Sequence, residues 1–158
     1  VVPTLVIDGK PMTESAALLM ILAERHPEAR LAPPVGTLAH QEWTQWIVYL
    51  SNTLASAYRL WFYPRDLGVT EHPPEIRVAI QRKIEAVWNR LDAHLAANGP
   101  YLLGDEFSGA DLQLTMHMRW SRMPRPVTEW PALKKLADLV RARASWKRLY
   151  EIEGLREW

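Results

Sequence analysis

Two long stretches of apolar residues at helical spacing constrain the fold of this chain more than any other feature. The first runs from about residue 37 to 62, and the second from about 72 to 98. Apolar residues that recur every three or four positions give a helix one buried face, which must pack against a partner. The two stripes consist of Trp43, Trp46, Ile47, Leu50, Leu54, Ala57, Tyr58 and Trp61, and of Ile76, Ile80, Ile84, Val87, Trp88, Leu91 and Leu95.

Shorter amphipathic patterns follow at about 108–122 and 131–143, with a last turn or two near 145–152. Each pattern has a single apolar stripe, so none of these helices is stable alone. We therefore expect residues 37–158 to form one all-α bundle.

The first 31 residues have a different pattern. Leu5–Ile7 is a β-branched, apolar run, and Asp8-Gly9 is a turn that closes hairpins. A helix is expected to begin at Thr13 or Ser15 and to end near His26-Pro27, because the residue before a proline leaves the α region. The stiff segment APPVG (32–36) is the predicted linker between residues 1–31 and 37–158.

Composition excludes several classes of protein. A net charge of +1 provides no basic face for nucleic acid, and no apolar run reaches the roughly 18 residues of a membrane helix. Without cysteine there is no thiolate ligand or cysteine nucleophile, and the five histidines share no i, i+4 pair, so no metal site is expected. The plain interpretation is a cytoplasmic protein.

The segment FSGADLQL (107–114) predicts a capped helix. Ser108 and Asp111 are three residues apart, which is the spacing of a capping box, and Phe107 stands at the staple position. Such a cap stabilises a helix by about 1 kcal/mol. Alone, it indicates folding rather than function.

Three segments together resemble cytosolic glutathione transferases of the bacterial type. VPTLVIDGKPMTES followed by ILAERHPEARLAPP resembles the second half of their thioredoxin-like domain, YLLGDEFSGADLQL the start of their sixth helix, and ASWKRLYEIEGLREW their C-terminal end. The resemblance covers essentially the whole chain in family order. It implies a mainly α fold: the family's C-terminal helical bundle, preceded by a hairpin and a helix from a truncated thioredoxin-like α/β domain.

The resemblance implies a glutathione-binding site at the N-terminal end. Pro3 would follow a cis peptide bond, exposing the backbone of Val2 to the cysteinyl part of glutathione, while Glu14 and Ser15 would hold its γ-glutamyl group. The residues alone also permit a trans proline that starts a strand, and a helix that Thr13 and Glu14 simply cap.

The family's thiol-activating serine, tyrosine or cysteine ends its first strand, and this chain begins at the third. The resemblance therefore implies that the catalytic residue lies upstream of Val1, in about fifty residues that were cleaved, disordered or unrecorded. It also implies that the fragment given by this sequence is inactive alone. No catalytic residue is assigned within the chain.

In the family, the second substrate binds between the fourth and sixth helices. The candidates to line this pocket are Asn52, Tyr58, Arg59, Trp61, Tyr63, Met116 and Trp120. An aromatic pocket with a few polar groups suits a hydrophobic electrophile. The alternative is that most of these aromatics belong to the core.

The implied function is conjugation of glutathione, as co-substrate and without metal, to a hydrophobic electrophile in detoxification. The alternatives are a non-catalytic interaction module, or a glutathione-dependent isomerase, dehalogenase or disulfide reductase. A homodimer through helices 37–62 and 72–98 is also implied, with a second contact face on the first of them. That face would comprise Thr44, Val48, Tyr49 and Ser51, although Val48 and Tyr49 could instead pack within one subunit.

Overall fold

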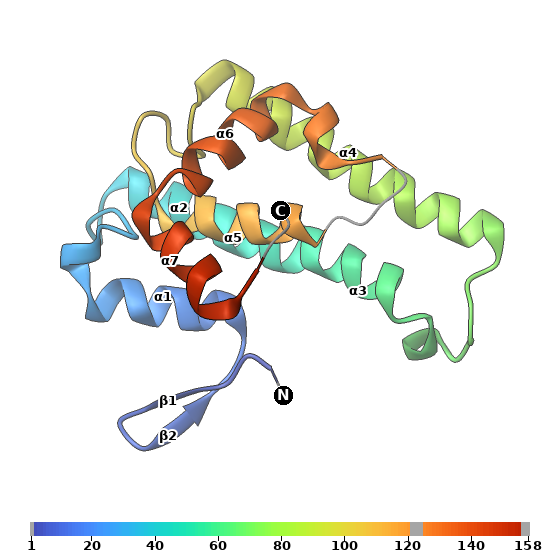
Figure 1. The fold of residues 1–158 in the computed structure, drawn as a ribbon, viewed down its shortest axis with the longest axis horizontal. Coiled ribbons are helices and arrows are strands. Elements are labelled where there is room, and N and C mark those ends of the chain that lie inside the picture. Colours follow the sequence, from blue (N-terminus) through green and yellow to red (C-terminus); the bar gives the residue numbers. More distant parts are fainter. Residues whose placement is uncertain (1, 121–124, 156–158) are drawn as a thin grey trace.

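The computed structural model describes residues 2–120 and 125–155 and is mainly helical, as the sequence predicts (Figure 1). It begins with a two-stranded antiparallel hairpin, β1 (Leu5–Ile7) and β2 (Lys10–Met12), in which Leu5 lies opposite Met12. The helix α1 (Ser15–Arg25) follows. In the view of Figure 1 the hairpin extends away from the helices, and Val6 is largely exposed.

The first long stripe folds as one continuous rod. It comprises α2 (Leu38–Tyr49), a π-helical stretch over Leu50–Ala55 and α3 (Ser56–Phe62). All eight stripe residues are buried, which confirms the predicted helical face. The π-helical stretch was not predicted, because a local widening of the helix leaves the average apolar spacing nearly unchanged.

The second long stripe is α4 (Pro74–Asn98), which begins with proline at its first position. Six of its seven predicted stripe residues are buried. The prediction was wrong for Ile76, which lies in the first turn of α4 and is 43% exposed. Figure 1 shows α4 running alongside the α2–α3 rod.

Three shorter helices complete the bundle: α5 (Gly109–Arg119), α6 (Pro131–Arg141) and α7 (Ala144–Glu153). The predicted end of the first, at 121–122, lies outside the described residues. Short 3₁₀ turns occupy Pro27–Ala29, Pro64–Leu67 and Val127–Glu129. One hydrophobic core runs from Ala23 in α1 to Trp146 in α7. None of the described helices is long and apolar enough to cross a membrane.

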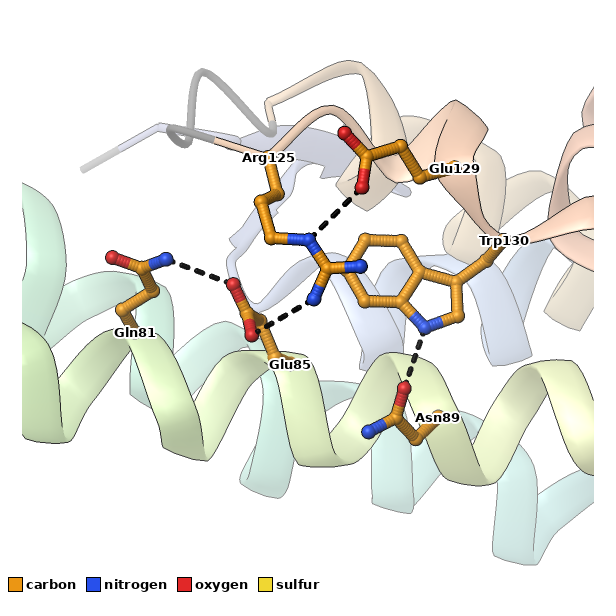
Figure 2. A network of polar contacts seen from close by, with 6 residues as sticks. All are labelled: Gln81, Glu85, Asn89, Arg125, Glu129 and Trp130. Atoms are coloured by element: carbon orange, nitrogen blue, oxygen red, sulfur yellow. Dashed lines mark hydrogen bonds and ion pairs between the residues drawn. The ribbon is translucent and has the colours of Figure 1, made fainter.

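A polar network joins α4 to the segment before α6 (Figure 2). The guanidinium of Arg125 lies 4.7 Å from the centre of the Trp130 ring and donates to Glu129 at 2.9 Å and to Glu85 at 3.3 Å. The indole N–H of Trp130 donates to Asn89 at 2.7 Å. These contacts fix the segment that leads into α6.

Candidate functional site

The Val2–Pro3 peptide bond is cis, as the sequence resemblance implies. Val2 is 94% exposed and directly precedes the hairpin. Its main chain therefore stands at an open surface, where an extended ligand backbone has access to it.

Glu14 has an unusual backbone at the start of α1. Its φ of 68° and ψ of 104° lie in a region that residues with a Cβ rarely adopt, and such strain concentrates at functional sites. Glu14 occupies the N-cap position of α1, but its side chain makes no capping hydrogen bond. Glu14 and Ser15 are both exposed. A carboxylate, a hydroxyl and a helix N-terminus together suit a ligand that carries both ammonium and carboxylate groups.

An ion pair ties the hairpin to α1. The Arg25 guanidinium donates to both oxygens of Asp8, at 2.7 and 3.0 Å, and lowers the pKa of that carboxyl. Asp8 lies in the β1–β2 turn and Arg25 in the last turn of α1. The pair is exposed, so it adds little to stability, but it is a direct contact between the hairpin turn and α1.

The predicted capping box is present at the start of α5. The Asp111 carboxylate accepts the backbone N–H of Ser108 at 2.8 Å and that of Leu102 at 2.8 Å. The Ser108 hydroxyl accepts from Ala110 N–H at 3.3 Å, one residue earlier than the spacing predicts. Burial raises the pKa of Asp111 to about 6, despite these hydrogen bonds.

The same cap holds α1 and the linker against α5. The N–H of Gly109 donates to the Leu31 carbonyl at 2.7 Å. A Cβ at Gly109 would lie 2.9 Å from a Leu19 methyl and 3.2 Å from the Leu31 oxygen, so only glycine fits without a shift. The helix that carries Ser15 is thereby placed relative to the bundle.

The residues predicted for the second-substrate pocket lie in two environments. Tyr58 and Trp61 belong to the hydrophobic core, which agrees with the alternative that most of these aromatic residues are core residues. Met116 is partly buried against that core. The others are exposed: Asn52 in the π-helical stretch, Arg59, Tyr63 and Trp120.

Two of these exposed residues are engaged with a neighbour near the end of α3. Arg59 pairs with Asp66 at 2.5 Å and lies over the Tyr63 ring at 4.6 Å.

Sequence reasoning missed His117. Its ring stacks near Tyr58, with centroids 6.4 Å apart, and meets the ring of Trp120 edge-on at 5.1 Å. Burial lowers its pKa to about 4, so the imidazole is neutral at pH 7. A signal existed: Ala110, Leu114, His117 and Met118 recur at helical spacing on one face.

A separate cavity of about 880 Å³ lies beside the linker. Its walls come from the last turn of α1, the residues just after it, linker residues 32–35, the start of α2 and the loop before α5. Of the residues that the sequence predicts for a site, the cavity is lined by Ser108 of the capping box. No group of three metal-ligating side chains was found in the part of the chain that the structure describes.

Sequence comparison shows what this chain is similar to. Residues 68–151 match the family described as "Glutathione S-transferase, C-terminal domain". The chain is 28% identical over 122 residues to glutathione S-transferase GstA of Escherichia coli O157:H7, and 30% identical over 127 residues to glutathione S-transferase GST-4.5 of Xanthomonas campestris pv. campestris. Each match covers 76% of this chain but only 57% and 59% of those two proteins.

Solved structures show the same similarity over nearly the whole chain. BphK, described as a bacterial GST in a ternary complex, has a TM-score of 0.86 at 27% identity, covering 98% of this chain and 75% of that one. A sphingomonad glutathione S-transferase complexed with glutathione has a TM-score of 0.85 at 25% identity, with the same two coverages.

Proposed function

The chain belongs to the glutathione S-transferase family, and from this premise we propose that the protein conjugates the thiolate of glutathione to a hydrophobic electrophile. Residues 1–31 would supply part of the glutathione-binding domain and residues 37–158 the helical domain, joined by the linker 32–36. No residue of the printed chain is assigned the role of activating the thiol.

The backbone of Glu14 carries the proposal. Its φ of 68° is strained, and its carboxylate is free of any capping bond at the N-terminus of α1. Glutathione presents an α-ammonium and an α-carboxylate on its γ-glutamyl group. Glu14 would take the ammonium, while Ser15 and the first N–H groups of α1 would take the carboxylate.

The exposed backbone of Val2 completes the proposed site. Val2 lies shortly before β1 in the chain, and its bond to Pro3 is cis. Its N–H and C=O would pair with the cysteinyl backbone of glutathione. Main-chain pairing of this kind gives affinity without requiring a particular side chain. The glutathione held by the sphingomonad relative supports this choice of ligand.

The electrophile would bind between α2–α3 and α5. Trp120 is 45% exposed and Met116 partly buried, so both offer apolar contact area, and Asn52, Arg59 and Tyr63 add exposed polar groups. The buried Tyr58 and Trp61 would support the pocket from behind. A thiolate is the reacting nucleophile in such a transfer, and the sulfur displaces or adds to the electrophilic carbon.

Calorimetric titration with glutathione tests the proposal on the chain itself. We expect saturable binding, which Glu14→Gln weakens and which Glu42→Gln, an exposed control on α2, leaves unchanged. Conjugation of 1-chloro-2,4-dinitrobenzene by the protein is then measured. Absence of glutathione binding would overturn the proposal. We further propose that this protein is a cytoplasmic homodimer that detoxifies such electrophiles.

A further inference from the structure

The cavity beside the linker has the size of a small-molecule site. Its volume of about 880 Å³ lies within the roughly 300–1,000 Å³ typical of ligand pockets. Most of its lining is apolar, and it shares no residue with the proposed glutathione or electrophile sites. A ligand of this cavity would therefore bind apart from the proposed glutathione and electrophile sites.

The linker wall of this cavity is held in place by hydrogen bonds. The carbonyl of Leu31 accepts from Gly109 N–H at 2.7 Å, and that of Pro34 from the Thr37 hydroxyl at 2.7 Å. His40 Nδ1 lies 2.9 Å from the Pro33 carbonyl oxygen. The carbonyl groups of Leu31, Pro33 and Pro34 therefore all have polar partners within the protein. A wall fixed in this way is preformed, which lowers the entropic cost of binding a ligand.

The aromatic ring of Phe107 also lines the cavity. Phe107 is fixed by Arg143, whose guanidinium lies 3.6 Å from the ring centre, and by the edge of Tyr101 at 5.7 Å. Pro33, Leu103 and Phe107 together give the cavity apolar walls that include two rings. Such surfaces favour a planar ligand body.

Three charged residues of the lining bear on the charge of a ligand that would fit the cavity. Glu24, Glu106 and Arg30 all line the cavity, and none of them forms an ion pair or side-chain hydrogen bond within the described residues. Among the described lining residues, two carboxylates stand against one guanidinium, a formal charge of −1, and all three of these side chains are exposed. Arg143 is a further cation nearby, on the ring of the lining residue Phe107. The two carboxylates are therefore the groups of the lining that could pair with a cationic ligand.

We propose that this cavity binds a small aromatic molecule that carries a primary ammonium group. The ring would lie against Phe107 and the prolines, and the ammonium would be placed between Glu24 and Glu106 at the mouth. Arg30 would then accept a second, anionic substituent where the ligand has one.

The probe for this proposal is 2-phenylethylamine, with 3-phenylpropionate as the matched anion, in calorimetric or ligand-observed NMR titrations of the full chain. We expect the amine to bind several-fold more tightly than the acid, and this preference to shrink between about 20 mM and 200 mM salt. The double variant Glu24→Gln, Glu106→Gln should weaken amine binding by about five-fold, and Arg30→Gln should strengthen it. Glu42→Gln is the surface control.

Blocking the cavity gives an independent test. Ala39 lines it and is exposed, so Ala39→Trp fills it from the surface and should abolish amine binding while the far-UV spectrum is kept. Val35→Trp is the second blocking variant if the first unfolds. Saturating glutathione should not displace the amine. Equal affinity for amine and acid, binding that survives both blocking variants, or no binding of the amine would overturn the proposal.

Discussion

Asp111 and Ser108 bind each other twice: the buried carboxylate of Asp111 accepts the Ser108 backbone N–H at 2.8 Å and the Ser108 hydroxyl at 3.1 Å. Both residues are buried, and Asp111 also accepts the N–H of Leu102. This pair therefore joins the loop before α5 to the first turn of that helix.

Ser108→Ala should lower the free energy of unfolding by about 1 kcal/mol, because a helix N–H loses its acceptor. Urea denaturation at pH 7 measures the change. Thr37→Ala, which removes an exposed cap from α2, is the matched control, since its hydroxyl accepts from His40 N–H at 3.2 Å. A smaller loss in the Ser108 variant than in the control would contradict a stabilising role for the buried cap.

Asp111→Asn should be most harmful in acid. The folded pKa of about 6 lies above the ordinary 3.8, so the folded state holds its proton where the unfolded state has lost it. The wild-type carboxyl thus contributes stability below pH 4 that is lost as pH rises through 6, roughly 3 kcal/mol in all. Urea titrations at pH 4 and pH 7 measure the wild-type minus variant difference. A difference independent of pH would contradict the raised pKa.

His117→Phe should show the opposite pH dependence. The folded pKa of about 4 lies below the ordinary 6.5, so the unfolded state binds a proton that the folded state refuses. The wild type is therefore destabilised relative to the variant as pH falls from 6.5 to 4, by roughly 3 kcal/mol. Phenylalanine keeps a ring against Tyr58 and Trp120. Equal acid sensitivity of the two proteins in urea titrations would contradict this assignment.

The helical bundle was predictable because its signal is periodic. Trp43 and Leu54 belong to a series of apolar residues at the spacing of a buried helical face, and both are buried in the structure. The exposure of Ile76 was not predictable, since a stripe does not show how far the neighbouring helices extend. Gly99–Pro100 is a second cis bond that no motif indicated.

The candidate site was predictable only where a local motif defines it. The cis bond at Pro3 followed from a family pattern, whereas the φ of Glu14 depends on how the chain enters α1. Among the aromatic residues near residue 60, helical spacing separated the buried stripe, which includes Tyr58 and Trp61, from Tyr63, but it did not show which of them line a pocket. Tyr58 and Tyr63 are five residues apart, yet one is buried and the other is 54% exposed.

Glu14→Ala and Ser15→Ala should each weaken glutathione binding about ten-fold or more, because a hydrogen bond to a charged group is worth about 1.5–3 kcal/mol. Calorimetry measures the affinity, and Glu42→Gln is the control. Neither variant should change the urea midpoint greatly, since both side chains are exposed. Unchanged affinity in both variants would mean that the pair has no part in binding.

The chain is expected to dimerise through the α2–α3 rod and α4. Val48 is 46% exposed on α2, so it is available for a contact between subunits. Tyr49 instead packs in its own subunit, 5.8 Å from Trp46 and beneath Arg90 at 4.7 Å. Val48→Asp should therefore weaken the dimer, whereas Val35→Asp, a similar change in the exposed linker, should not. Light scattering over a concentration series measures the assembly, and a mass near 18.2 kDa at every concentration would exclude a dimer of this chain.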